Sequence, residues 1–139
     1  MELEALQEVD SEVRKLGARI LSISPQLEKY ARNVHRKLHL TFDILTDFHL
    51  KTAEQFGIVF VLPDYLRELY TSFGNRLDIF HDESEYRLPM SARYIIDSSS
   101  IIRAADVNAD YTIRPEPSDT VSLLRALRAS DATSHEARS

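Results

Sequence analysis

Apolar residues recur every three or four positions at the start of the chain, between acidic and basic residues. They are Leu3, Leu6, Val9, Val13 and Leu16. This spacing places them on one face of a helix, with the charged residues on the other face. Gly17 follows directly, and glycine often ends helices because it accepts a left-handed backbone. The pattern therefore predicts an amphipathic helix over residues 2–16.

Short β-rich runs then alternate with helical stretches. The predicted strands cover residues 18–24, 40–45 and 58–62, which are rich in Ile, Leu, Val and Phe. The predicted helices cover residues 25–37, 49–56 and 63–73. Pro25 and Pro63 stand where helices tolerate proline, in the first turn. Gly57 and Gly74 are the expected helix ends.

Two further β-rich runs, residues 92–96 and 101–107, follow a mixed polar stretch over residues 75–88 that we interpret as a loop. The four residues Asp97–Ser100 separate these runs. Two strands joined by a short polar segment are typical of a β-hairpin. The sequence therefore predicts a hairpin in this part of the chain.

A last amphipathic helix is predicted over residues 118–128, after the proline-rich link 114–117. Its inner face carries Val121, Leu124 and Leu127. Ser118 is the expected N-cap, and Asp119 suits the positive end of the helix dipole. Residues 129–139 contain no apolar anchor, so we expect a disordered tail after a domain that covers residues 1–128.

Composition narrows the classes of function. The length of 139 residues fits one domain, and 43% apolar with 28% charged residues is typical of globular proteins. A net charge of -5 argues against a nucleic-acid partner. No apolar run approaches the ~20 residues of a membrane-spanning helix, and the acidic start does not resemble a signal peptide. We therefore expect no membrane association and a cytoplasmic location.

The 139 residues contain no cysteine. This excludes disulfides, cysteine-ligated zinc, iron–sulfur clusters and a thiol nucleophile from these residues. No other single feature of the composition removes as many kinds of chemistry.

Five segments carry a resemblance to a known family. They are LGARILSISPQ (16–26), LTFDILTD (40–47), EQFGIVFVLPDYLRELYTSFG (54–74), ARYIID (92–97) and ADVNADYTIRPEP (105–117). In this order they resemble the peroxiredoxin-like branch of the alkyl hydroperoxide reductase and thiol-specific antioxidant (AhpC/TSA) family. The resemblance covers roughly residues 1–128. It implies an α/β thioredoxin-like fold and, in intact relatives, thiol-dependent reduction of peroxides.

The resemblance also implies that a segment is missing. Relatives begin with a strand and a tryptophan–cysteine motif, and then continue into a helix with a pattern like ELRALQ. Here ELEALQ, residues 2–7, follows Met1 at once. We therefore expect an incomplete central sheet flanked by helices, without the strand and cysteine turn that precede the first helix. A second departure is Ser91, where the resemblance implies a proline that is commonly cis.

The missing strand would lie between the strands of residues 18–24 and 92–97, so each would lose a hydrogen-bonding neighbour. Exposed strand edges are closed, covered or adhesive in natural proteins. We expect either that these two strands approach each other or that the chain associates, with another copy or with an intact homologue.

Histidines are the first candidates for a metal site. His35 and His39 stand four apart, which on a helix places both rings on one face. The alternative, which we favour, is a solvated basic helix end without a third ligand. His49, His81 and His135 lie in expected loops and the tail, and add no metal pattern.

Other chemistry has weaker support. Ser, His and Asp are all present, but no nucleophile elbow of the G-x-S-x-G type occurs. Three glycines provide no phosphate-binding loop. Phe56, Phe60, Tyr65, Tyr70 and Phe73 suggest either a ligand pocket or, as we favour, core packing. In this interpretation Leu66, Leu69, Tyr70 and Phe73 line one helix face.

The most distinctive polar stretch contains Asp110, Tyr111, Arg114 and Glu116, and it matches the DYT-R-PEP signature of the family. It either fixes the link between the last strand and the last helix, with Arg114 paired to a carboxylate, or binds a ligand. We favour the structural role because proline restricts the backbone on its own.

The sequence thus predicts a truncated or degenerate peroxiredoxin-like protein that is inactive as a peroxidase. It assigns no catalytic, cofactor-binding or metal-binding residue, and no cofactor. Met1 and Met90 are oxidisable but do not turn over. Two alternatives remain: a non-catalytic interaction or dimerisation module, and a fragment of a longer, active peroxiredoxin.

Overall fold

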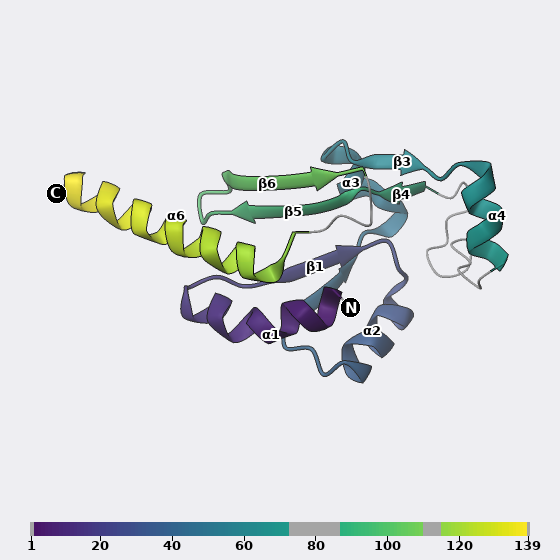
Figure 1. Cartoon of the computed structure of the whole chain (residues 1–139), viewed down its shortest axis with the longest axis horizontal. Coiled ribbons are helices and arrows are strands. Elements are labelled where there is room, and N and C mark those ends of the chain that lie inside the picture. Colours follow the sequence, from purple (N-terminus) through teal and green to yellow (C-terminus); the bar gives the residue numbers. More distant parts are fainter. Residues whose placement is uncertain (1, 73–86, 110–114, 139) are drawn as a thin grey trace. The chain divides into compact units, whose positions relative to one another are not determined.

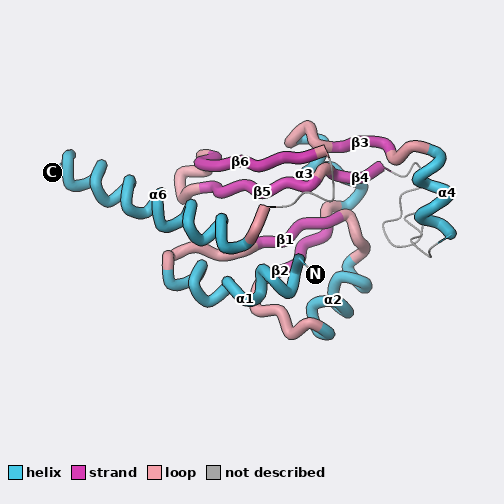
Figure 2. The backbone as a smooth tube through the Cα atoms, viewed as in Figure 1, coloured by secondary structure: helices cyan, strands magenta, loops and turns pink. Residues whose placement is uncertain are grey.

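The computed structural model describes residues 2–72, 87–109 and 115–138. Helices and strands alternate up to residue 72, and three consecutive strands and a last helix follow in the described residues after 86 (Figures 1 and 2). The elements are α1 (Glu2–Lys15), β1 (Leu21–Ser24), α2 (Glu28–Lys37), β2 (Asp43–Thr46), η1 (Phe48–Leu50), α3 (Lys51–Gln55), β3 (Val59–Val61), α4 (Asp64–Ser72), β4 (Arg87–Pro89), β5 (Ser91–Ile96), β6 (Ile102–Asn108) and α6 (Pro117–Arg138).

The chain divides into two compact units, where one domain over residues 1–128 was predicted. The terminal unit consists of Met1–Ile20 and Ser91–Ser139, and the middle unit is Leu21–Met90. The terminal unit contains α1, the hairpin β5–β6 and α6. The middle unit contains the remaining elements.

The terminal unit pairs its two helices and its hairpin. Helix α1 packs against α6, and Val13 from α1 and Val121 from α6 are buried. Leu124 and Leu127 are half-buried, as predicted for the inner face of the last helix. The predicted hairpin is confirmed, since β5 and β6 are antiparallel neighbours (Figure 1).

A β-bulge interrupts this hairpin near its turn. Ile95 lies opposite Ala104 and Ile96 lies opposite Ile102, so Arg103 is an extra residue in β6. In an unbroken strand Arg103 and Ala104 would point to opposite faces. A bulge removes this alternation locally and re-aims a side chain.

The middle unit contains two small sheets. Strands β1 and β2 are parallel, with Ile23 beside Leu45, and α2 packs against β2. Strands β3 and β4 are antiparallel. Leu62, directly after β3, is buried against Phe60, Leu66 and Leu88. The other buried apolar side chains of this unit are Ala31, Leu40, Phe42, Leu50 and Ala53.

Three helices end in the same way. After α1, α2 and α3 a residue has positive φ: Gly17 at 79°, His39 at 51° and Gly57 at 69°. In each case the next amide donates to the carbonyl five residues back, as in Ala18 N to Val13 O at 3.1 Å. This is the Schellman motif, which favours glycine because a side chain disfavours the left-handed backbone. The two glycine ends were predicted. The end of the second helix was predicted at about Lys37, without the left-handed backbone of His39.

A buried carboxylate organises the start of α3. Asp47 accepts hydrogen bonds from the amides of Thr52 and Ala53, both at 2.8 Å, through its two oxygens. Its own amide donates to Ser24 O at 2.8 Å, at the end of β1. One aspartate therefore satisfies two N–H groups of a helix start and links that start to the first sheet.

The described strands pair as three two-stranded sheets, β1–β2, β3–β4 and β5–β6, in keeping with the predicted incomplete sheet flanked by helices. Among the described strands β1 pairs with β2 and β5 pairs with β6, so the approach of residues 18–24 to residues 92–97 stays a prediction. Strands β1, β2 and β3 are shorter than predicted, whereas β5 and β6 are not. Residues 18–20 leave α1 through the Schellman motif, and so β1 begins only at Leu21.

Two predicted helix starts were wrong. Helix α2 begins at Glu28, three residues after Pro25, and Leu27 O accepts its first backbone hydrogen bonds. Helix α6 begins at Pro117, with the carbonyl of Glu116 accepting from the amides of Asp119 and Thr120. Ser118 is therefore inside the first turn rather than the N-cap. Its carbonyl accepts a hydrogen bond from Ser122 Oγ.

Helix α6 does not end at Arg128 but continues to Arg138, so the predicted disordered tail is helical over residues 129–138. A contact that the apolar pattern does not reveal, between Asp131 and the hairpin, supports this extension. In the stretch predicted as a loop, residues 87 and 88 belong to β4.

The aromatic residues predicted to form a core are mostly at the surface. Tyr65 is 72% exposed and Phe56 is 39% exposed, whereas Phe60 packs against Leu62. Leu69 is exposed as well, so α4 turns Leu66 rather than Leu69 inward. The side chain of Tyr70 and all of Phe73 lie outside the described residues, as does Gly74.

Candidate functional site

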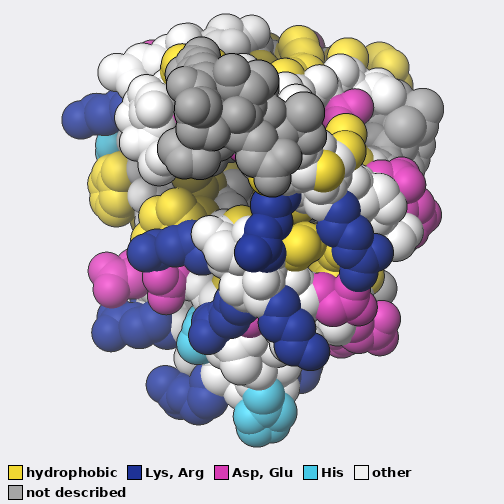
Figure 3. Space-filling view, turned by 90° about the vertical axis from the view of Figure 1, so that its left-hand side faces the viewer, with side chains coloured by type: hydrophobic (Ala, Val, Ile, Leu, Met, Phe, Trp, Pro, Cys, Tyr) yellow, Lys and Arg dark blue, Asp and Glu magenta, His cyan; other side chains and the backbone are white. Residues whose placement is uncertain are grey.

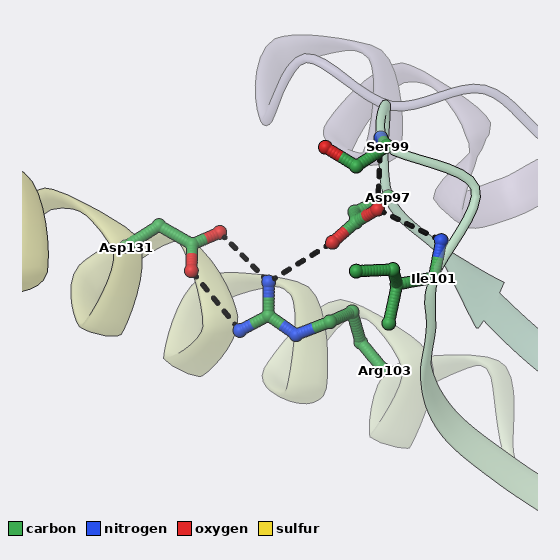
Figure 4. A network of polar contacts seen from close by, with 5 residues as sticks. All are labelled: Asp97, Ser99, Ile101, Arg103 and Asp131. Carbon is green, nitrogen blue, oxygen red and sulfur yellow. Dashed lines mark hydrogen bonds and ion pairs between the residues drawn. The ribbon is translucent and has the colours of Figure 1, made fainter.

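The most connected polar group of the terminal unit joins the hairpin to α6 (Figure 4). Arg103 donates from Nη1 to Asp131 Oδ2 at 3.2 Å and from Nη2 to Asp131 Oδ1 at 3.0 Å. Nη1 also lies 3.5 Å from Asp97 Oδ2. The guanidinium therefore bridges a carboxylate of the hairpin turn and a carboxylate of the last helix. Such two-bond pairing fixes orientation as well as position.

Asp97 shapes the hairpin turn itself. Its Oδ1 accepts from the amide of Ser99 at 2.9 Å and from the amide of Ile101 at 3.0 Å (Figure 4). The left-handed backbone of Ser100, with φ of 64°, completes the turn. An aspartate that binds amides two and four residues ahead favours this geometry.

The charge state of this group follows from these contacts. The hydrogen bond from the Ile101 amide is the main reason that the pKa of Asp97 lies below its ordinary value, and the Ser99 amide and Arg103 act in the same direction against desolvation. The hydrogen bond to Asp131 raises the pKa of Arg103 above its ordinary value. Both groups therefore stay charged at neutral pH.

A second arginine of the hairpin also reaches α6. Arg93 donates from Nη1 to Thr120 Oγ1 at 2.8 Å and pairs through Nη2 with Asp106 on the neighbouring strand. Arg93 lies directly opposite Asp106 in the ladder. The two arginines thus tie opposite ends of the hairpin to one helix.

Charged contacts likewise join α6 to α1. Arg125 Nη2 lies 2.9 Å from Glu12 Oε2, and Arg128 Nη1 donates to Lys15 O at 3.2 Å, at the end of α1. Within α1, Arg14 Nε pairs with the buried Asp10 at 3.1 Å. Arg125 and Arg128 therefore hold α6 to α1, whereas Arg14 and Asp10 pair within one helix.

The structure does not bring the predicted histidines together as a metal site. His35 lies in the last turn of α2, whereas His39 follows the helix with a left-handed backbone, so the helical face that would align them ends between them. His49 also has positive φ and its ring meets the Phe48 ring edge-on. The part of the chain that the structure describes holds no cluster of three metal-binding side chains. His81 and the side chain of His135 lie outside that part.

Ser91 is buried at the start of β5, opposite Asn108. The peptide bond before it is trans, unlike the cis bond of the proline expected there from the family resemblance. Most of the DYT-R-PEP stretch, residues 110–114, lies outside the described residues. Glu116 is described, and its carbonyl receives the first hydrogen bonds of α6.

Sequence reasoning missed Arg103, Asp131, Arg93 and Asp47. The spacing D-x-S at residues 97–99 was a usable signal for the turn. Asp131 was assigned to a tail, and its partner stands 28 residues away. Figure 3 shows Lys and Arg side chains next to Asp and Glu side chains on one face of the molecule.

The comparisons with known proteins give the family. The model of the AhpC/TSA family matches residues 1–105, which is more than half of the chain. The chain belongs to the AhpC/TSA family. The family resemblance is thereby confirmed over the first four sequence segments, whereas the fifth, residues 105–117, lies almost wholly outside the match.

A solved structure of this family has a similar fold. It is the crystal structure of a cysteine-to-serine mutant of peroxiredoxin 6 from Arenicola marina, with a TM-score of 0.65 and 15% sequence identity. The match covers 94% of this chain and 55% of that peroxiredoxin, so the chain spans about half of its length. At this identity the likeness shows the fold alone, a mixed α/β, thioredoxin-like fold. No match was found among curated proteins.

None of the described helices is both long and apolar enough to cross a bilayer.

Proposed function

We propose that this 139-residue AhpC/TSA chain is a peroxiredoxin-like protein that does not itself catalyse peroxide reduction. The observation that carries the proposal is the absence of cysteine from its sequence. Thiol peroxidase chemistry needs a thiolate that attacks the peroxide oxygen, becomes a sulfenic acid and is restored by another thiol. No side chain of these residues can enter that cycle. We place the protein in the cytoplasm as part of this proposal.

The polar contacts of the terminal unit support a structural role for its charged residues. Arg93, Arg103 and Arg125 each contact a carboxylate of another element. A general acid or base needs to meet a substrate proton at hydrogen-bond distance. In the terminal unit these guanidinium groups form ion pairs with the carboxylates instead.

Peroxide consumption by the full chain, with a thiol reductant in excess, tests the proposal. We expect the rate to equal that of a heat-denatured control, because only stoichiometric oxidation of Met1 and Met90 to sulfoxide is available. Mass spectrometry of the same samples counts the oxygen atoms added per chain. Sustained consumption of many peroxide molecules per chain would refute the proposal.

A second candidate, an association module, rests on strand β1. Among the described strands β1 pairs with β2 alone, and its Leu21 and Ile23 are 45% and 50% exposed. An unpaired edge with apolar side chains favours addition of another strand. The partner would be a second copy of the chain or an intact relative.

Light scattering over a concentration series tests this association. We expect a mass above that of the monomer, 16.0 kDa, at high concentration. Ile23→Gln in β1 would restore the monomer, while Leu69→Gln, which changes an exposed side chain of α4, would not. A chain that stays monomeric at every concentration contradicts the association module and leaves the first proposal intact.

A further inference from the structure

Helix α6 is held differently before and after Arg128. Before it, Val121 is buried, Leu124 and Leu127 are half-buried, and Arg125 pairs with Glu12 of α1. After it, every residue from 129 to 132, the last whose side chain is described, is exposed. Apolar burial therefore anchors the first part of the helix and contributes nothing over residues 129–132.

The contact of Asp131 with Arg103 takes the place of that burial. Both Asp131 oxygens accept from the guanidinium, at 3.2 and 3.0 Å (Figure 4). Short polar helices are marginal in water without tertiary contacts. The sequence after Arg128 is polar or Ala throughout, and so the docking of this segment depends on charge.

We propose that residues 129–138 form an arm that the Arg103–Asp131 ion pair latches to the hairpin and that rising ionic strength releases. The side chains are 26% and 58% exposed, so mobile ions reach the pair and screen it. The hinge lies at Arg128, which binds the last carbonyl of α1. Asp97 contacts the same guanidinium, so it would hold the Arg103 side chain at the hairpin turn after the arm is released.

Release of the arm would change the surface of the hairpin. Arg103 loses the carboxylate of α6 and keeps that of its own turn, so one side of its guanidinium becomes available to another anionic group. The exposure of the Arg103 guanidinium would therefore depend on the salt concentration, because salt releases the arm that covers it.

Amide hydrogen exchange of the full chain tests the latch. Raising the salt from about 0.01 M to about 1 M shortens the Debye length from about 30 Å to about 3 Å. We expect exchange in residues 132–138 to become about two- to fivefold faster relative to residues 121–127, the range that an exposed ion pair supports. Equal ratios at both salt concentrations, or equal loss of protection in both segments, would overturn the proposal.

Variants separate the latch from general damage to the helix. Asp131→Asn removes the charge at nearly equal helix propensity, and we expect it to give the fast exchange already at low salt. Asp131→Glu keeps the charge and should keep the protection. Arg125→Gln cuts the ion pair that joins α6 to Glu12 of α1 and serves as the matched control, with the arm still protected. Slow exchange in Asp131→Asn, or release of the arm in Arg125→Gln, would contradict the latch.

Discussion

The middle unit buries six apolar side chains in the described part of the chain, whereas the terminal unit buries two, Val13 and Val121. The terminal unit instead joins its hairpin and helices by ion pairs of Arg93, Arg103 and Arg125. Burial of apolar area is insensitive to ordinary salt, whereas exposed ion pairs are screened. The middle unit also has an ion pair between elements, Arg87 with Glu54. Apolar burial nevertheless weighs more in the middle unit and ion pairs weigh more in the terminal unit, so different changes should weaken each of them.

Loss of a large core side chain from the middle unit should have the largest effect. Phe42 is 3% exposed, and Phe42→Ala should lower the free energy of unfolding by about 3–5 kcal/mol, because it removes the ring and leaves a cavity. Urea denaturation measures this loss. Tyr65→Ala, at a 72% exposed position, is the control, with a change within about 0.5 kcal/mol. A small effect of Phe42→Ala would contradict the conclusion that the stability of the middle unit rests mainly on apolar burial.

The Asp47 cap comes next in size. Asp47→Ala leaves the amides of Thr52 and Ala53 without their acceptor in a partly or fully buried site, at a cost of about 1–3 kcal/mol. Asp47→Asn keeps one acceptor oxygen and should lose less. Equal losses for the two variants, measured by urea denaturation, would mean that the side chain acts through packing alone.

His39 offers a stabilising change. Its positive φ disfavours any side chain, so His39→Gly should raise the free energy of unfolding by about 1 kcal/mol. His35→Gly, in the last turn of α2, should lower it by a similar amount, because glycine weakens helices. The two variants remove the same side chain, and thermal denaturation should shift their midpoints in opposite directions.

The pH dependence of Asp97 should be the smallest effect, and it concerns the terminal unit. Because its pKa is lower in the folded chain than its ordinary value of 3.8, its contribution to stability is complete above that value. The contribution is lost as the pH falls through the lower, folded value. The difference in stability between the native chain and Asp97→Asn should therefore be constant near neutral pH and shrink in acid. A difference that grows in acid would show that folding raises the pKa of Asp97 instead of lowering it.

The local pattern of the sequence predicted the elements better than their ends. The hairpin was predicted because two β-rich runs flank the short polar segment Asp97–Ser100, and Gly17 and Gly57 do end helices. The strand predicted from residue 18 was too long because residues 18–20 still belong to the exit of α1. A run of apolar residues does not distinguish a strand from the segment that leads into it.

The polar network could not be predicted from spacing. Arg103 reaches α6 because a bulge turns it, and Asp131 lies in a segment without apolar periodicity. The position of a bulge depends on how two strands pair, which a single run of residues does not contain. The absence of cysteine, in contrast, was evident from the sequence and supports the proposed lack of peroxidase activity.

The extra residue at position 103 divides the hairpin into two segments that differ in phase by one residue. A relative that lacked this one residue would keep the pairing of Ala104–Asn108 with β5 and lose the arginine that bridges to Asp131. When related sequences are aligned, a single-residue gap in β6 is therefore best placed at position 103, because a gap there leaves the pairing of Ala104–Asn108 unchanged.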